Sequence, residues 1–219
     1  VCATNAVDWH KLTLPDMLTS LMIAAAAAAT APTIVSTEAY EWRGDTIVQG
    51  EYRAWAVSPE EIKSTYHARP GYFMPIEQSW RRKNDLSAYP RLEASNRLLQ
   101  AVFNMGLDEM VNAVEPDTTL RTGKEWAGVW TRDVSYSIIL SMAALQPEAS
   151  RISLMRKVNE QGQIIQDTGS GGAWPVSSDR LVWVLAAWEV YKVTGDRAWL
   201  ETAYPIACRS LAKDSETVA

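Results

Sequence analysis

Hydrophobic residues recur at helical spacing through the C-terminal part of the chain. Over residues 91–116, apolar side chains follow one another at three- and four-residue steps, which predicts a long amphipathic helix that ends near Pro116. The same spacing, with Pro147 at a helix start and Gly195 at a stop, predicts further helices over 133–145, 147–158, 178–193 and 197–213. The pattern indicates helical hairpins joined by long loops.

The pattern differs in residues 38–90, where glycines and prolines divide short apolar stretches. Residues 42–57 predict two short strands around a turn. The step Ser58-Pro59-Glu60-Glu61 is typical of a helix start and predicts one short helix through Tyr66.

The first 37 residues are typical of a secretory leader. Lys11 precedes an apolar stretch and an alanine run, and Ala29-Thr30-Ala31 has the small residues of a cleavage site. This predicts a secreted or periplasmic protein, while an alanine-rich helix packed on the body is the alternative. We therefore divide the chain into a leader-like segment (1–37, disordered or helical), a short β or irregular region (38–90) and a helical region (91–219).

Composition narrows the classes of function. The 219-residue chain has a net charge of -5 and no sustained run of Lys or Arg, which argues against a nucleic-acid partner. Two cysteines and two histidines indicate neither a disulfide framework nor a histidine-based metal site, and we predict no metal, no cofactor and no membrane span in the mature chain. The chain has ten tryptophans and only two phenylalanines, and this excess indicates that some tryptophans have a role outside the core.

The loop over 122–133 carries the first candidate site. Arg132 offers a planar fork of donors, Asp133 stands at a predicted helix start, and Trp126 or Trp130 offers an apolar face. These groups suit two adjacent sugar hydroxyls and a sugar ring. The alternative is that Asp133 only caps the helix and Arg132 is its surface neighbour.

A glycine-rich loop over 163–175 leads into the fourth predicted helix. It lacks the lysine of a phosphate-binding loop, so we expect it to bring Trp174 and Asp179 to the same rim as Asp133. The alternative is that Ser178 or Asp179 is a helix cap.

Trp130-Thr131-Arg132-Asp133, followed by Val-Ser-Tyr-Ser-Ile-Ile-Leu, resembles the motif that opens a helix in six-hairpin glycosidases, the clan of glucoamylases, trehalases and debranching-type glucosidases. The stretch 194–205 is similar to a helix-turn-helix step of the same clan, and the likeness covers residues 91–219, nearest to bacterial secreted members. The resemblance implies a mainly α fold class, an incomplete α/α toroid preceded by a short β-hairpin region.

The resemblance also implies inverting hydrolysis of an O-glycosidic bond in an oligosaccharide or polysaccharide. Such hydrolysis needs a carboxylic acid and a carboxylate about 6.5–9.5 Å apart. Arg132 and Asp133 would bind the sugar together with Trp130, Trp174 and Asp179. Asp133 is a candidate catalytic residue, but the main acid and base are expected beyond Ala219.

Length leads to a further expectation. About five helices fill residues 91–219, so a ring of twelve would need roughly 300 residues. We therefore expect an N-terminal fragment of a longer exported glycosidase, inactive by itself. A noncatalytic carbohydrate-binding protein and a polysaccharide lyase remain alternatives, and no self-similarity at a fixed period is visible in the sequence.

Overall fold

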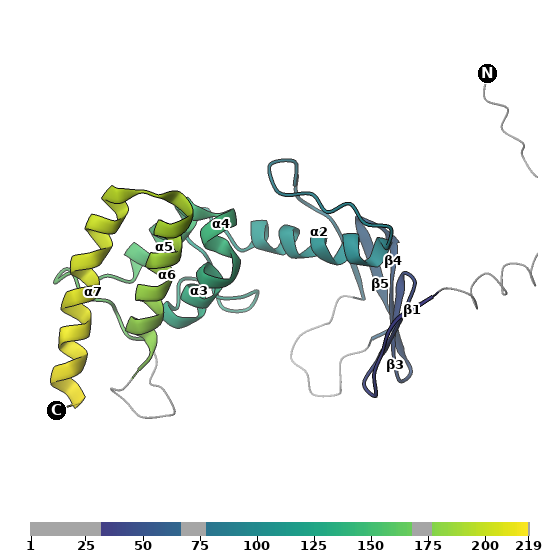
Figure 1. The fold of residues 1–219 in the computed structure, drawn as a ribbon, viewed down its shortest axis with the longest axis horizontal. Helices are drawn as coiled ribbons and strands as arrows, with labels where there is room; N and C mark the ends of the chain where they lie inside the picture. The colour runs from purple at the N-terminus through teal and green to yellow at the C-terminus, as the bar shows by residue number, and fades with distance from the viewer. Residues whose placement is uncertain (1–31, 67–77, 168–176, 219) are drawn as a thin grey trace, which may run out of the picture. The chain divides into compact units, whose positions relative to one another are not determined.

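The structure is a computed structural model that describes residues 32–66, 78–167 and 177–218 (Figure 1). These residues form two compact units. Unit 1 contains the described residues up to Arg82 together with Arg91–Met105, and unit 2 contains Lys83–Pro90 and the described residues from Gly106 onward. The division therefore falls inside helix α2 (Arg97–Asn112), whereas the sequence places a boundary at residue 90.

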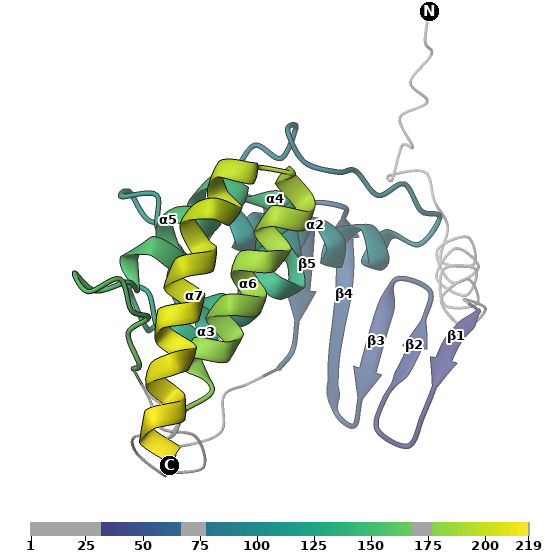
Figure 2. The same ribbon diagram turned by 60° about the vertical axis from the view of Figure 1, so that its left-hand side comes forward.

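Unit 1 is built on a six-stranded antiparallel sheet. The strands pair in chain order: β1 (Thr33–Ser36), β2 (Glu41–Arg43), β3 (Thr46–Gln49), β4 (Tyr52–Ser58), β5 (Glu61–Ser64) and β6 (Ser79–Arg81). Figure 2 shows β1 to β5 side by side in this order. The predicted fold class, a mainly α incomplete α/α toroid behind a short β-hairpin region, is therefore wrong, because the chain is mixed α and β. The short helix predicted through Tyr66 is also wrong, since its residues form β5.

The leader predicted over 1–37 falls mostly outside the described residues, which begin at residue 32. Within its last part, Thr33–Ser36 pairs with β2 as the first strand of the sheet. These four residues thus belong to unit 1.

One face of the sheet packs against the first half of α2. Ala56 of β4 is buried with Leu98 and Ala101 of the helix, and four partly buried side chains pack around them: Trp42, Ile47, Ile62 and Trp80. These strand residues share a face, because directly paired residues point to the same side of a sheet.

Helix α2 begins at Arg97 because two side chains accept its first backbone N–H groups. Asp45 Oδ1 accepts from the N–H of Arg97 at 2.7 Å, and Asn96 Oδ1 accepts from the N–H of Leu99 at 2.8 Å. The Asn96 contact is that of an N-cap residue. The amphipathic pattern starts at residue 91, and it does not reveal that Asp45, in the β2–β3 turn, accepts an N–H at the start of the helix.

Unit 2 is helical apart from its loops. Its helices are α3 (Thr131–Ser137), the π-helical turn η2 (Ile138–Met142), α4 (Ala143–Leu145), α5 (Pro147–Arg156), α6 (Asp179–Thr194) and α7 (Arg197–Val218). The four helices predicted after residue 130 are confirmed to within a few residues, apart from an extension of the last one to Val218. In the described ranges, no helix combines the length and the apolar character needed to cross a membrane.

Helices α6 and α7 form an antiparallel hairpin (Figure 2). Trp183 of α6 is fully buried, and its indole N–H donates to the carbonyl of Leu154 in α5 at 2.8 Å. Trp199 of α7 is also buried and donates to the carbonyl of Ala187 at 2.9 Å. Both indoles therefore fill the core without leaving a buried donor unpaired.

Two loops of unit 2 repeat the same backbone turn. Val114 bridges to Leu120, and Val158 bridges to Ile164 at positions 44 residues later. In each loop a buried serine from a later helix accepts the second bridge residue's N–H: Ser153 for Leu120 at 2.7 Å, and Ser210 for Ile164 at 2.9 Å. A structural repeat is thus present that the residue types alone do not reveal.

Candidate functional site

The start of α3 is fastened to the loop that precedes α6. Thr131 is buried; its backbone N–H donates to Asp167 Oδ2 at 2.6 Å and its hydroxyl donates to the carbonyl of Ile165 at 2.8 Å. Trp130, the residue before the helix, makes no side-chain cap. Asp167, 36 positions later in the chain, therefore supplies the acceptor for a backbone N–H at the start of α3.

Asp167 is held in turn by a lysine. Lys157 Nζ donates to Asp167 Oδ1 at 2.7 Å, and both side chains are mostly buried. Burial raises the pKa of the Asp167 carboxyl, but hydrogen bonds from Lys157 and Thr131, with the charge of Lys157, outweigh burial and leave that pKa below its ordinary value. The carboxylate is therefore the stable form in this setting.

A second carboxylate lies behind the first. Asp179, the first residue of α6, is fully buried, and its Oδ2 accepts the backbone N–H of Asp167 at 2.8 Å. Its Oδ1 lies 3.7 Å from Nε of Arg132. Because a buried carboxylate requires compensating partners, Asp179 fixes both the loop at Asp167 and the guanidinium of Arg132.

Arg132 remains partly open to solvent. Its side chain is 28% exposed, and Nη1 lies 3.5 Å from the hydroxyl oxygen of Ser178. The arginine of α3 is thus oriented by the start of α6, while part of the side chain stays accessible to a ligand.

Three exposed side chains flank Arg132 in the sequence. Trp130 is 40% exposed, Trp126 is 61% exposed and Asp133 is exposed in the first turn of α3. Both indoles leave apolar surface in water that a ligand ring can cover. Asp133, the residue after Arg132, adds an exposed acceptor.

Arg121 and Thr122 pin the loop that carries Trp126. The guanidinium of Arg121 donates to the carbonyls of Gly123 and Lys124, each at 2.9 Å. The hydroxyl of Thr122 donates to the carbonyl of Gly128 and accepts the N–H of Trp130, both at 3.1 Å. Side-chain bonds to backbone groups therefore fix the loop around its exposed indole.

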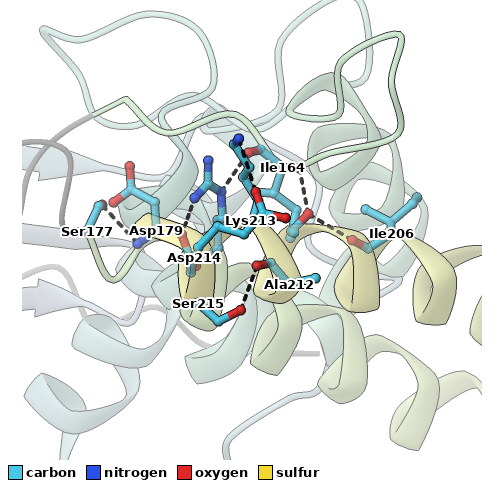
Figure 3. A network of polar contacts seen from close by, with 11 residues as sticks. Ile164, Ser177, Asp179, Ile206, Ala212, Lys213, Asp214 and Ser215 are labelled. Atoms are coloured by element: carbon cyan, nitrogen blue, oxygen red, sulfur yellow. Dashed lines mark hydrogen bonds and ion pairs between the residues drawn. The ribbon is translucent and has the colours of Figure 1, made fainter. Parts of the chain in front are cut away.

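The loop before α6 is anchored on its other side by the α6–α7 hairpin. Ser210 accepts the N–H of Ile164 and donates to the carbonyl of Ile206 at 2.8 Å (Figure 3). Arg180, next to Asp179, forms an ion pair with Asp214 of α7 (Figure 3). The site scaffold thus extends from α3 through the loop to both later helices.

The structure brings together some of the predicted site residues. Trp130, Arg132 and Asp133 are consecutive or nearly so, and Asp179 lies beside Arg132. Asp179 itself has no exposed surface, so its contact is with Arg132 and the loop. Trp174 lies outside the described residues.

Sequence reasoning missed the roles of Thr131, Lys157 and Asp167. No local motif joins them, because the contacts link positions 10 and 36 residues apart. The available signal was weak: Asp167 is the second polar residue after the apolar pair Ile164-Ile165.

Two hollows of unit 2 lie elsewhere. One, of about 720 Å³, lies between α5 and α7 and is lined by Met155, Trp199 and the Arg151–Asp196 ion pair, among others. The other, of about 230 Å³, is an apolar groove between α6 and α7 that includes Trp188 and Tyr204. The candidate site is instead an exposed surface around Arg132. No protein family, curated protein or solved structure matches the chain.

Proposed function

We propose that the protein is a glycoside hydrolase and that this chain carries part of its sugar-binding subsite. One observation supports the proposal most: buried Asp179 lies against the partly exposed Arg132, which is followed by exposed Asp133 and lies two residues after exposed Trp130. The resemblance of residues 130–133 to the six-hairpin glycosidase motif points to the same role.

The chemistry of these groups suits a neutral sugar. Arg132 can donate hydrogen bonds in a fixed plane to the hydroxyl oxygens of a sugar. Asp133 can accept hydrogen bonds that sugar hydroxyls donate. Trp130 and Trp126 offer apolar faces to a pyranose ring. Asp179 acts through Arg132 in this proposal.

Orientation of Arg132 before binding matters for affinity. A long side chain loses rotamer freedom when a ligand immobilises it, and this loss weakens binding. The contacts of Arg132 with Asp179 and Ser178 restrict that freedom in advance. The substrate then meets a donor fork that is already in place.

The proposed reaction is inverting hydrolysis of an O-glycosidic bond in an exported protein. A protonated carboxyl group protonates the leaving oxygen while a carboxylate activates water, which requires the two groups to be about 6.5–9.5 Å apart. Asp133 is a candidate for one of them. Export rests on the leader-like segment, most of which lies outside the described residues.

Calorimetric titration with gluco-, manno- and xylo-oligosaccharides of three or more units tests the proposed binding. We expect Arg132→Lys to weaken binding at least about tenfold, because lysine lacks the planar fork. Arg197→Lys is the matched control, since Arg197 is exposed on α7 and its ion-pair partner within the described residues is nearby Glu201. Binding of none of these sugars, or equal affinity in Arg132→Lys, contradicts the proposal.

A second experiment tests the reaction. For any oligosaccharide that is hydrolysed, proton NMR of the first-formed product is expected to show an inverted anomeric configuration. A retained configuration would contradict the proposed mechanism.

A further inference from the structure

The second face of the unit 1 sheet carries charged and hydrogen-bonding side chains. Helix α2 packs on the face that contains Ala56, and in the described part of unit 1 no helix packs on the opposite face. Cross-strand pairs place a row on that opposite face from β2 to β6: Arg43, Thr46, Trp55, Lys63 and Ser79. Four steps between strands make this row roughly 19 Å long.

Positive charge exceeds negative charge on this face. A neighbouring row and the strand ends add Glu41, Arg53, Glu61 and Arg81. Arg43 pairs with Glu41, while Lys63 and Arg81 share Glu61. Among the described residues no carboxylate lies within ion-pair distance of Arg53, so the four cations face two carboxylates.

Arg53 stacks on an aromatic ring of the same strand, β4. Its guanidinium carbon lies 5.5 Å from the centroid of the Trp55 ring, a cation–π distance. Arg53 is nevertheless exposed. A guanidinium that stacks on an aromatic ring keeps the donors along its edge available for a planar, bidentate partner such as a carboxylate.

The two carboxylates discriminate between classes of anion. Glu41 and Glu61 repel a dense polyanion such as a nucleic acid, and the chain has a net charge of -5. The same two groups accept hydrogen bonds, which the hydroxyls of a sugar donate. A ligand that alternates carboxylates with hydroxyl groups along a chain therefore complements this face in both charge and hydrogen bonding.

We propose that this face, defined by Arg53, Trp55, Lys63 and their row neighbours, binds a polysaccharide built of uronic acids. The carboxylates of the polysaccharide contact Arg53 and Lys63, and the hydroxyls of the polysaccharide contact Glu61 and Thr46. The binding surface is independent of the proposed site around Arg132, which lies in the other unit.

Biolayer interferometry of the full 219-residue chain on immobilised polygalacturonate tests the proposal, with fully methyl-esterified polygalacturonate as the matched neutral polymer. We expect binding to the acid form that weakens with added salt, and at least about tenfold weaker binding to the ester, because the ester lacks the carboxylates. Equal binding to the ester, equal binding to single-stranded DNA, or no binding to the acid form overturns the proposal.

Variants locate the surface. The double change Arg53→Gln and Lys63→Gln is expected to reduce affinity at least about tenfold and to flatten the salt dependence, since two ligand contacts lose their charge. Arg91→Gln with Lys192→Gln removes the same charge from exposed positions outside the sheet and is expected to leave affinity within about twofold. Both variants change exposed side chains, and thermal melts confirm folding. Wild-type affinity in the first variant, or equal losses in both, overturns the assignment.

Discussion

Asp167 accepts the backbone N–H of Thr131 at 2.6 Å, although 36 residues separate the two in the chain. The contact replaces a local cap at the start of α3 and joins it to the loop that leads to α6. Because Lys157 and Asp179 hold Asp167 from two other directions, the start of α3 has a single defined position. The orientation of Arg132 beside Asp133 depends on this arrangement.

Replacement of Asp167 by alanine is expected to destabilise unit 2. The change leaves the N–H of Thr131 and the ammonium of Lys157 without their acceptor in a mostly buried setting, and a charged hydrogen bond of this kind is worth about 1.5–3 kcal/mol. Urea unfolding followed by circular dichroism measures the loss.

The control for this change is Arg156→Ala. Arg156 forms an ion pair with Asp117 in which both side chains are more than half exposed, so solvent screens it. Little change in the free energy of unfolding is expected. A loss in Arg156→Ala as large as that in Asp167→Ala would show that the Asp167 network has no special weight.

Stability is expected to fall at acid pH through Asp167. Its pKa is lower in the folded chain than in the unfolded chain, where it is about 3.9, so the unfolded state binds protons more readily. The stabilisation is complete above the unfolded pKa and is lost as pH falls through the folded pKa. Urea midpoints measured from pH 6 to pH 2 should decline less steeply in Asp167→Asn, and parallel curves would contradict the assignment.

The two repeated turns differ at their left-handed residue, which gives a paired prediction. Thr118 has φ 64° and Gly162 has φ 68° in corresponding positions. A β-branched residue is strained there by about 1–2 kcal/mol, and glycine relieves this at an entropic cost of about 0.4–1 kcal/mol in the unfolded chain. Thr118→Gly is therefore expected to raise stability slightly.

Gly162→Ala is the reciprocal change. An added Cβ would meet Nη2 of Arg209 at 2.5 Å in addition to the positive φ, so a loss of about 1–2 kcal/mol is expected. Thermal melts of both variants give the comparison. A gain from Gly162→Ala or a loss from Thr118→Gly would show that the two turns are not equivalent.

Two tryptophans on α6 separate core packing from surface exposure. Trp183→Phe removes the indole donor to the carbonyl of Leu154, which then keeps the N–H of Lys157 as a donor, and opens space in the core. The change is expected to cost about 1–3 kcal/mol. Trp188 is 47% exposed, so Trp188→Phe should have little effect. Chemical unfolding of both variants tests the distinction, and equal losses would contradict it.

Helices could be predicted from the sequence because their signals are local. Pro147 begins α5 and Gly195, with φ 65°, ends α6, as the pattern indicates. The six-stranded sheet could not be predicted in this way. Most of its strands have only three or four residues, and each strand is defined by its pairing with a neighbour and not by a local pattern. Ser58-Pro59-Glu60 shows the ambiguity: Ser58 accepts the N–H of Glu60 in a turn between strands instead of capping a helix.

The candidate site could be predicted only in part. Residues 130–133 are adjacent in sequence, so their proximity requires no fold. Asp179 was expected on an exposed rim, but it is buried because its acceptors are used by Asp167 and Arg132. Trp188 lies on the apolar side of α6 but is nearly half exposed, since the arc of α6 that faces α5 and α7 is narrower than its apolar pattern.

The most direct test of the proposed sugar site uses the indole N–H signals of the ten tryptophans in a proton–nitrogen correlation NMR spectrum, assigned by single Trp→Phe changes. Titration with the tightest-binding neutral oligosaccharide is expected to shift the signals of Trp126 and Trp130. The signals of Trp183 and Trp199 should stay in place, because their N–H groups donate inside the core. A titration that leaves Trp126 and Trp130 unchanged would contradict the account.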